Sequence, residues 1–242
     1  MLYIIGLGLN VKGISREGLE VIKKCSKIYL ENYTVEFPYS LKELEKVVGK
    51  KIIELNRDEV ESEKLVKEAK GKDIVLLIYG SPLFATTHMS LVNDCKKSRI
   101  KVKNIFSAGI FDALGETGLQ LYKFGKISSM PKWEKSYEPY SFLEFVEQNQ
   151  IIEAHSLILM DICLDFKDAL EQLEKAVEKE SYDIKIDKIL VCSKLGSEKA
   201  KIFYGDVKKF KGIGKKIKAP FCFIIPGKMH FMEEEVVRGF GV

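Results

Sequence analysis

The feature that most constrains the fold is a short, uninterrupted apolar run, Ile74–Tyr79, which ends at Gly80-Ser81-Pro82. The run is too short for a helix, and the lack of polar alternation is typical of a strand buried on both faces. Such strands belong to parallel sheets that helices cover on both sides. The glycine and proline that follow predict a tight turn in which the backbone can approach a ligand closely.

Strand patterns and helical patterns alternate along the chain. In the first half we expect strands at 2–5, 28–31, 51–55, 74–79 and 101–106, and helices at 15–25, 41–48, 61–70, 89–97 and 110–122. In the second half we expect strands at 126–130, 156–162, 188–193, 201–204 and 220–225, and helices at 141–149 and 167–180. This order predicts an α/β protein built from βαβ units, with a mainly parallel sheet in a first domain, 1–124, and a second domain at 125–242.

Composition narrows the class of protein. The 242 residues carry a net charge of +4, from 39 basic and 35 acidic side chains, which is too mild to require a nucleic-acid or membrane partner. None of the five cysteines forms a C-x-x-C pair, so we expect reduced thiols and a cytoplasmic protein. The three histidines lack metal-ligand spacing, and we expect no metal site. The apolar start, Met1–Leu9, is too short to span a bilayer and predicts the first strand.

Small residues follow several predicted strands, and each such exit is a candidate ligand loop because open α/β sheets bind ligands beyond the carboxyl ends of their strands. Gly6-Leu7-Gly8 suggests a dinucleotide fingerprint, with Glu31 as the ribose-binding acid, but Val11 occupies the position of the third glycine. The open alternatives are a weak NAD site or a tight turn that faces another adenosine-like ligand.

Three further exits have the same ambiguity between ligand binding and local packing. Ser107-Ala-Gly109 opens a helix and offers free backbone N–H groups, although close helix packing needs the same small residues. Pro226-Gly227 presents Lys228 and His230. Thr86 or Thr87 is expected to cap the helix at 89–97.

Six short motifs resemble one known family, in matching order over nearly the whole chain. They are Gly6-Leu-Gly-Leu9, Gly80-x-Pro-Leu-x-Ala-Thr-Thr-His88, Ala113-Leu-Gly-x-Thr-Gly-Leu119 with Tyr122-Lys-Phe-Gly125, His155-x-Leu-x-Leu-x-Asp-Ile162, Leu195-Gly-Ser197 and Pro226-Gly-Lys-x-His230. The family is the diphthine synthases, S-adenosylmethionine-dependent methyltransferases with the tetrapyrrole methylase fold. The resemblance implies two α/β domains, the second with a mixed sheet, a cofactor held in the cleft between them, and a homodimer.

The resemblance also implies an activity. Its substrate would be translation elongation factor 2, on which the amino group of a 3-amino-3-carboxypropyl-histidine becomes methylated during diphthamide biosynthesis. Neither a membrane nor direct contact with nucleic acid is required. By position, the cofactor contacts would be Leu9, Ser81, Phe84, Gly109, Ile110, Met160, Tyr204 and His230. Two positions depart from the family pattern: Ser81 replaces the usual aspartate, and Tyr204 replaces a smaller residue.

The catalytic base is not assigned by these patterns. Methyl transfer from a sulfonium is an in-line displacement, so the protein mainly positions and desolvates the amine, which must be neutral to attack. His88 and His230 are the candidates, whereas His155, just before a strand, is expected to be structural.

Two alternatives stay open. A methyltransferase of the same fold could act on a tetrapyrrole or on ribosomal RNA, and a nucleotide-binding module or NAD oxidoreductase would use the same glycines. The lysine-rich run 208–218 is expected to be a solvated hairpin loop, with docking of a large protein substrate as the second interpretation.

Overall fold

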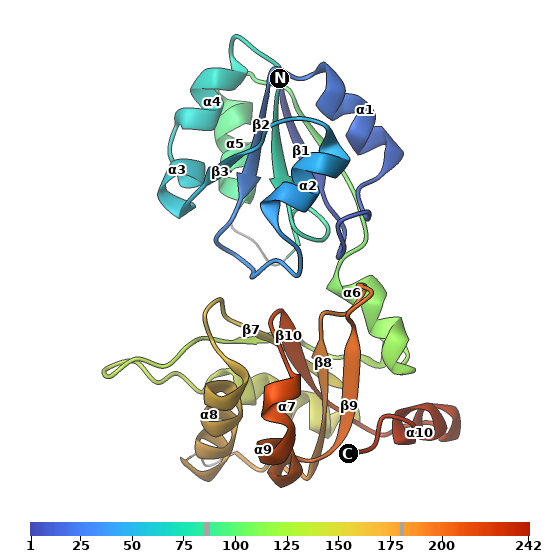
Figure 1. Ribbon diagram of the computed structural model, residues 1–242. Helices are drawn as coiled ribbons and strands as arrows, with labels where there is room; N and C mark the ends of the chain where they lie inside the picture. The colour runs from blue at the N-terminus through green and yellow to red at the C-terminus, as the bar shows by residue number, and fades with distance from the viewer. Residues whose placement is uncertain (85–87, 180–181) are drawn as a thin grey trace. The chain divides into compact units, whose positions relative to one another are not determined.

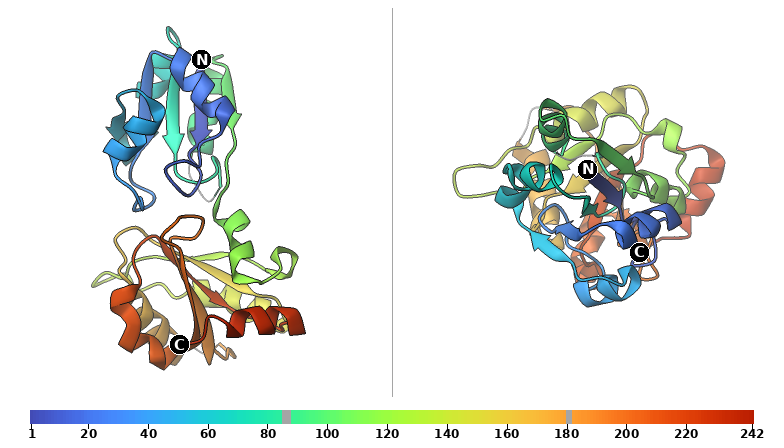
Figure 2. Two further views of the ribbon diagram at one scale, coloured as in Figure 1. Left: turned by 45° about the vertical axis from the view of Figure 1, so that its right-hand side comes forward. Right: turned by 90° about the horizontal axis from the view of Figure 1, so that it is seen from above.

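The computed structural model describes residues 1–84, 88–179 and 182–242, and the chain divides into two compact units, Met1–Ala113 and Leu114–Val242 (Figure 1). We had expected the division later, between Phe124 and Gly125. Each unit contains its own sheet of five strands. Figure 2 gives two further views of the elements of each unit.

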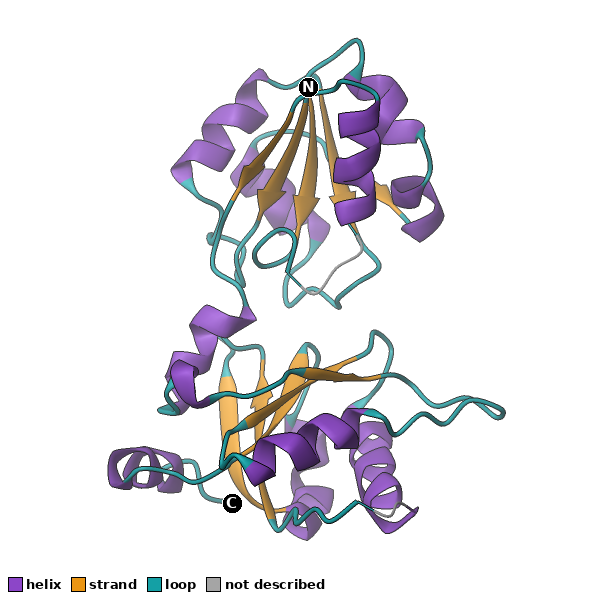
Figure 3. Ribbon diagram, turned by 180° about the vertical axis from the view of Figure 1, so that it is seen from behind, coloured by secondary structure: helices purple, strands orange, loops and turns teal. Residues whose placement is uncertain are grey.

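Unit 1 is built on a parallel sheet of order β3-β2-β4-β1-β5. Its strands are β1 (Leu2–Gly6), β2 (Lys27–Glu31), β3 (Ile53–Leu55), β4 (Ile74–Ile78) and β5 (Val102–Ile105). Its helices are α1 (Arg16–Lys24), α2 (Leu41–Val48), α3 (Arg57–Glu61), α4 (Lys64–Ala69), α5 (Met89–Lys97) and α6 (Ile110–Ala113). Helices cover both faces of this sheet (Figure 3). The expected parallel sheet is thus confirmed.

The central strand β4 explains why its sequence lacks alternation. All five of its residues are buried. Leu76 packs into one apolar cluster with Leu2 and Ile4, whereas Val75 and Leu77 pack into a second cluster on the opposite face. Because successive side chains of a strand point to opposite faces, both faces of β4 need apolar residues.

Unit 2 is built on a mixed sheet of order β6-β7-β10-β8-β9, in which β6 pairs with β7 in parallel and the pairs β7–β10, β10–β8 and β8–β9 are antiparallel. Its strands are β6 (Ser128–Met130), β7 (Ser156–Met160), β8 (Lys188–Ser193), β9 (Lys201–Asp206) and β10 (Phe221–Ile225). Its helices are α7 (Phe142–Ile151), α8 (Phe166–Lys179), α9 (Phe210–Ile213) and α10 (Phe231–Arg238). Phe166 contacts the rings of Phe210, Phe221 and Phe223 in its core.

Several helix expectations were wrong in detail. The helix expected at 110–122 ends at Ala113, and 3₁₀ turns follow at Leu114–Thr117 and Leu121–Lys123. The helix expected at 61–70 is preceded by a separate helix, α3, which a capping box on Asn56 begins. The lysine-rich run is not a hairpin loop. It forms short helical turns because buried Phe210 and Ile217 anchor it to the core.

The C-terminal helix α10 was not expected. His230 and Glu233 form a capping box at its start, in the pattern that initiates helices. Within the described residues, no helix combines the length and the apolar character needed to cross a membrane. The proposed caps Thr86 and Thr87 lie outside the described residues.

Candidate functional site

Three strand exits of unit 1 converge, as their glycines predicted. The loop after β1 and the loop after β4 pair through two backbone hydrogen bonds, from Gly8 N–H to Gly80 O at 3.2 Å and from Gly80 N–H to Gly8 O at 3.0 Å. Tyr79 adds a hydroxyl donor to the Leu9 carbonyl at 3.0 Å. The third exit, the loop after β5, lies next to the loop after β4. Its Gly109 Cα is 3.7 Å from the position that a Cβ on Gly80 would occupy.

Glycine is required at this convergence for two reasons. A Cβ on Gly6 would lie 2.5 Å from the Gly80 carbonyl and 2.8 Å from Pro82 Cδ, so the loops would have to separate. Gly80 itself has φ +73°, a conformation that side chains rarely adopt. Leu83 adopts φ 67° without being glycine, which stores strain in the loop that carries Ser81 and Phe84.

The polar groups of the loop after β5 are hydrogen-bonded within the protein, which its sequence did not suggest. Ser107 donates its hydroxyl to the Gly13 carbonyl at 2.7 Å, and Gly109 donates its N–H to Asp112 Oδ2 at 2.6 Å. The expectation of a free N–H at Gly109 is therefore wrong, because Asp112 already accepts it. Asp112 was missed by sequence reasoning, although an acidic residue three positions after a small turn residue is a recognisable capping signal.

Apolar side chains line the same region. Phe84 is exposed and its ring lies 5.3 Å from that of Phe111, while Leu9 is buried beside Gly80. Ile110 is half-buried and begins α6. Bare backbone next to apolar and aromatic side chains suits a nucleoside with a flat base. The unit 1 residues assigned to the cofactor therefore form one cluster: Leu9, Ser81, Phe84, Gly109 and Ile110.

His88 and Glu31 lie next to each other in an enclosed environment. His88 is 2% exposed, and its Nε2 lies 3.3 Å from Glu31 Oε2 and 3.5 Å from the Tyr33 hydroxyl. Burial lowers the pKa of His88 to about 4, and burial raises that of Glu31. Glu31 also accepts from the N–H and hydroxyl of Thr34 at 3.2 and 2.5 Å, so it is a structural acid and the proposed ribose contact was wrong.

The structure does not bring the unit 2 candidates together. Leu159, the neighbour of Met160, pairs with Cys222, whereas Ile225 pairs with Ser156 at the other end of the antiparallel strands. His230 follows Ile225, so Met160 and His230 are at opposite ends of β7 and β10, which are about 13 Å long. Tyr204 lies in the edge strand β9, which β8 separates from β10.

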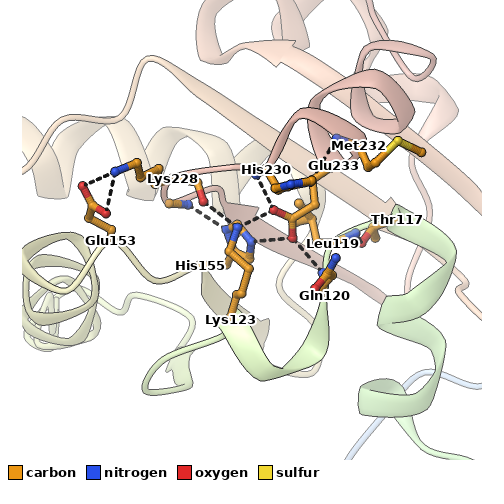
Figure 4. A network of polar contacts seen from close by, with 11 residues as sticks. Thr117, Leu119, Gln120, Lys123, Glu153, His155, Lys228, His230, Met232 and Glu233 are labelled. Atoms are coloured by element: carbon orange, nitrogen blue, oxygen red, sulfur yellow. Dashed lines mark hydrogen bonds and ion pairs between the residues drawn. The ribbon is translucent and has the colours of Figure 1, made fainter.

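His230 has a local structural role. Its Nδ1 accepts the Met232 N–H at 3.4 Å, and its ring lies 4.2 Å from that of Phe231. Its backbone N–H donates to the buried carboxylate of Glu233 at 2.7 Å (Figure 4). Sequence reasoning missed Glu233. Among the described residues, no group of His, Cys, Asp and Glu side chains is arranged to hold a metal ion.

Comparison with known proteins agrees with this architecture. Residues 1–211 match the family described as Tetrapyrrole (Corrin/Porphyrin) Methylases. The chain belongs to the tetrapyrrole methylase family. Within it, the chain is 40% identical to the diphthine synthase of Methanocaldococcus jannaschii over 98% of both sequences. A diphthine methyl ester synthase of Schizosaccharomyces pombe is 42% identical over 67% of this chain and 58% of its own length.

Solved structures extend the similarity. A crystal structure of diphthine synthase has a TM-score of 0.88 at 31% identity and covers 99% of this chain and 95% of its own. A putative diphthine synthase from Entamoeba histolytica gives the same TM-score and identity over 100% of this chain and 98% of its own. The chain is thus an S-adenosylmethionine-dependent methyltransferase of the diphthine synthase type, and the competing interpretation as an NAD oxidoreductase is excluded.

Proposed function

We propose that this protein methylates translation elongation factor 2 during diphthamide biosynthesis. The acceptor is the amino group of a 3-amino-3-carboxypropyl-histidine. The observation that carries the proposal is the similarity to archaeal diphthine synthases along 98% of both sequences, together with the converging glycine loops of unit 1. We also propose that the protein acts in the cytoplasm, where translation factors work, and as a homodimer.

The proposed cofactor contacts are the unit 1 cluster defined above together with Met160, Tyr204 and His230. The unit 1 cluster has the features that the cofactor needs: a glycine cradle and apolar side chains for the nucleoside. When bound, the cofactor supplies an activated methyl group on a sulfonium. The contribution of the chain is to hold and orient this group, because displacement at carbon depends on alignment of donor and acceptor.

Proton removal from the amine sets a second requirement, since only a neutral amine attacks. The low pKa of His88 keeps its imidazole neutral at pH 7. Its burial, however, points to a role in fixing the start of α5, so we expect a His88→Ala enzyme to lose stability and to retain turnover in its folded fraction. If neither His88→Ala nor His230→Ala slows methylation, the proton leaves through water.

The decisive experiment is mass spectrometry of elongation factor 2 that carries the precursor histidine, after incubation with enzyme and cofactor. We expect a mass gain of whole methyl groups on that residue and none on factor with an unmodified histidine. A tetrapyrrole and ribosomal RNA, each tested in parallel, address the alternative acceptors. Arginines would pair with the carboxylates of a tetrapyrrole, and the chain has only four of them: Arg16, Arg57, Arg99 and Arg238. Methylation of the tetrapyrrole or of ribosomal RNA, with none on the factor, would overturn the proposal.

A further inference from the structure

Two neighbouring strand exits of unit 1, those of β2 and β3, carry an arginine and a tyrosine in contact. Glu31 at the end of β2 is paired with Leu55 at the end of β3, and the Asn32 N–H donates to the Leu55 carbonyl at 3.3 Å. Tyr33 and Arg57 follow these residues, and the guanidinium carbon of Arg57 lies over the Tyr33 ring, 5.4 Å from its centre. The aromatic ring restricts the orientation of the planar guanidinium before any ligand binds.

Arg57 is only weakly paired within the chain. Its side chain is 64% exposed, and its Nε lies 4.0 Å from Glu61 Oε1, which is beyond hydrogen-bond distance. Within the described residues, the guanidinium of Arg57 donates no hydrogen bond. By contrast, the matching pair on α1 is closed by a hydrogen bond from Arg16 Nε to Glu20 at 3.0 Å. The terminal nitrogens of Arg57 are therefore available to a ligand.

The loop after β2 connects this arginine with the glycine loops. The ring of Phe37 in that loop lies 5.2 Å from the ring of Tyr79, the residue before Gly80, and Tyr79 is hydrogen-bonded to the carbonyl of Leu9 in the unit 1 cluster. In the sheet, β2 lies between β3 and β4. Because neighbouring strands are about 4.8 Å apart, the exits of β3 and β4 are roughly 10 Å apart.

The proposed acceptor has a group that suits an arginine at this distance. In the 3-amino-3-carboxypropyl side chain, the reacting amine and a carboxylate are attached to the same carbon. Whatever holds the carboxylate therefore also limits where the amine can point. Arginine is the side chain best suited to this task, because two of its N–H groups can bind both oxygens of one carboxylate.

We propose that Arg57, held over the Tyr33 ring, binds the carboxylate of the 3-amino-3-carboxypropyl group and so directs the neighbouring amine toward the methyl donor. The inference rests on the function proposed above and names the residue that recognises the acceptor. Arg57 is thus a substrate-binding residue that contributes to both affinity and alignment, since methyl transfer depends on the geometry of the attacking nitrogen.

The cofactor also carries an amino acid group with a carboxylate, and it is the other possible source of the ligand. Two observations favour the acceptor. The proposed cofactor contacts of unit 1 lie at the exits of β1, β4 and β5, whereas Arg57 follows β3 on the far side of β2. The large exposure of Arg57 suits a side chain that arrives on another protein, while small ligands are mostly enclosed by their sites.

The test measures binding of two forms of elongation factor 2, one with the precursor histidine and one with an unmodified histidine. Calorimetry in the presence of S-adenosylhomocysteine compares wild type, Arg57→Gln and Arg57→Lys. We expect the wild type to prefer the precursor form by about tenfold or more, as one charged hydrogen-bonded pair allows. Arg57→Gln should bind both forms equally. Arg57→Lys should recover part of the preference, because lysine keeps the charge and loses the forked geometry.

Arg16→Gln is the matched control, because Arg16 also begins a helix of unit 1 and faces a glutamate four residues later. It should keep the preference of the wild type. Binding of S-adenosylhomocysteine alone should be the same in all variants. The thermal unfolding midpoints should also agree, since exposed ion pairs contribute little to stability. The kcat/KM for methylation of the factor should fall with the lost preference in Arg57→Gln only.

The outcomes separate this inference from the proposed function. Equal binding of the two forms by the wild type, or an undiminished preference in Arg57→Gln, would overturn the role of Arg57. If Arg57→Gln instead weakens binding of S-adenosylhomocysteine, Arg57 holds the carboxylate of the cofactor and the inference fails. Methylation of the factor by the wild type with an unchanged rate in Arg57→Gln removes only the inference. No methylation by the wild type removes the proposed function and the inference with it.

Discussion

At the scale of single residues, the unit 1 site depends on glycines whose missing side chains let loops touch. Gly6 is the clearest case, since the Gly80 carbonyl and Pro82 occupy the space that a Cβ would need. Its neighbours are backbone and a proline ring, neither of which can rotate away as a flexible side chain would. The glycine at position 6 is therefore required for packing of the two loops, in addition to its proposed role in ligand binding.

Gly6→Ala should lower the free energy of unfolding by about 2 kcal/mol, because the loops after β1 and β4 must separate. It should also weaken binding of S-adenosylhomocysteine, measured by calorimetry, by tenfold or more. Gly71→Ala is the control, because no atom lies within 4 Å of a Cβ at Gly71. Equal urea midpoints for the two variants would contradict this explanation of Gly6.

A second residue-scale prediction concerns His88. Its pKa is about 4 in the folded protein and about 6.5 in the unfolded chain, because burial disfavours the charged ring. Above pH 6.5 both states are neutral and the group contributes nothing. As the pH falls from 6.5 to 4 the unfolded chain takes up a proton that the folded protein does not, so the free energy of unfolding decreases, by at most about 3 kcal/mol.

The measurement is urea unfolding at pH 7 and pH 5 for the wild type and His88→Gln. We expect the free energy of unfolding to decrease much less between pH 7 and pH 5 in His88→Gln than in the wild type. In the control His230→Gln we expect the same decrease as in the wild type. The charged and polar groups near His88 are Glu31, Tyr33 and Glu61. They are the same in wild type and control. An unchanged pH dependence in His88→Gln would show that the buried ring is not its source.

At the scale of elements, the sequence predicted those whose pattern is local. β4 and the alternating strands and helices of unit 1 follow from apolar runs and turn residues. The prediction of a hairpin loop for the lysine-rich run was wrong, because the structure of the run depends on two buried side chains, Phe210 and Ile217, that anchor it to the core of unit 2. Helix α10 was missed because His230 was interpreted only as the end of a ligand motif, and Glu233, its partner in the capping box, was not considered.

The contacts of Glu233 in α10 predict that substitutions of two adjacent glutamates, Glu233 and Glu234, change the free energy of unfolding by unequal amounts. Burial opposes ionisation of Glu233, but Lys123 and the N–H donors of Gln120 and His230 outweigh it and lower its pKa to about 2. Glu233→Gln should therefore reduce the free energy of unfolding at pH 7 by about 3 kcal/mol, because it removes the charge that these donors share. Glu234→Gln, which removes an exposed pair with Arg238, should change it by less than about 0.5 kcal/mol.

The pH dependence gives a further check on Glu233. Its pKa is depressed on folding, so its contribution is complete above the unfolded value near 4.5 and is lost as the pH falls toward 2. Urea unfolding at one protein concentration and at pH 7, 4.5 and 3 should show the two variants converging at acid pH. If both variants lose similar amounts of unfolding free energy at pH 7, the contacts of Glu233 contribute little to stability.

At the scale of the whole molecule, the two units have separate cores, and the similarity to the Methanocaldococcus jannaschii diphthine synthase extends over both. The cluster in unit 1 could be anticipated because parallel strands end at one edge of a sheet. The separation of Met160 from His230 could not, because the antiparallel pairing of β7 with β10 has no local sequence signal.

Hydrogen exchange with and without S-adenosylhomocysteine tests which unit contributes each contact. We expect the ligand to slow exchange at 6–9, 80–84 and 107–110 in unit 1 and around Met160 and Tyr204 in unit 2, because bound backbone opens less often. NAD at the same concentration should slow none of them. Because the His230 amide is already bonded to Glu233, its exchange should be slow without ligand and change little. Slowing confined to unit 1 would remove Met160 and Tyr204 from the cofactor site, and strong slowing at 226–230 would restore His230 as a direct contact.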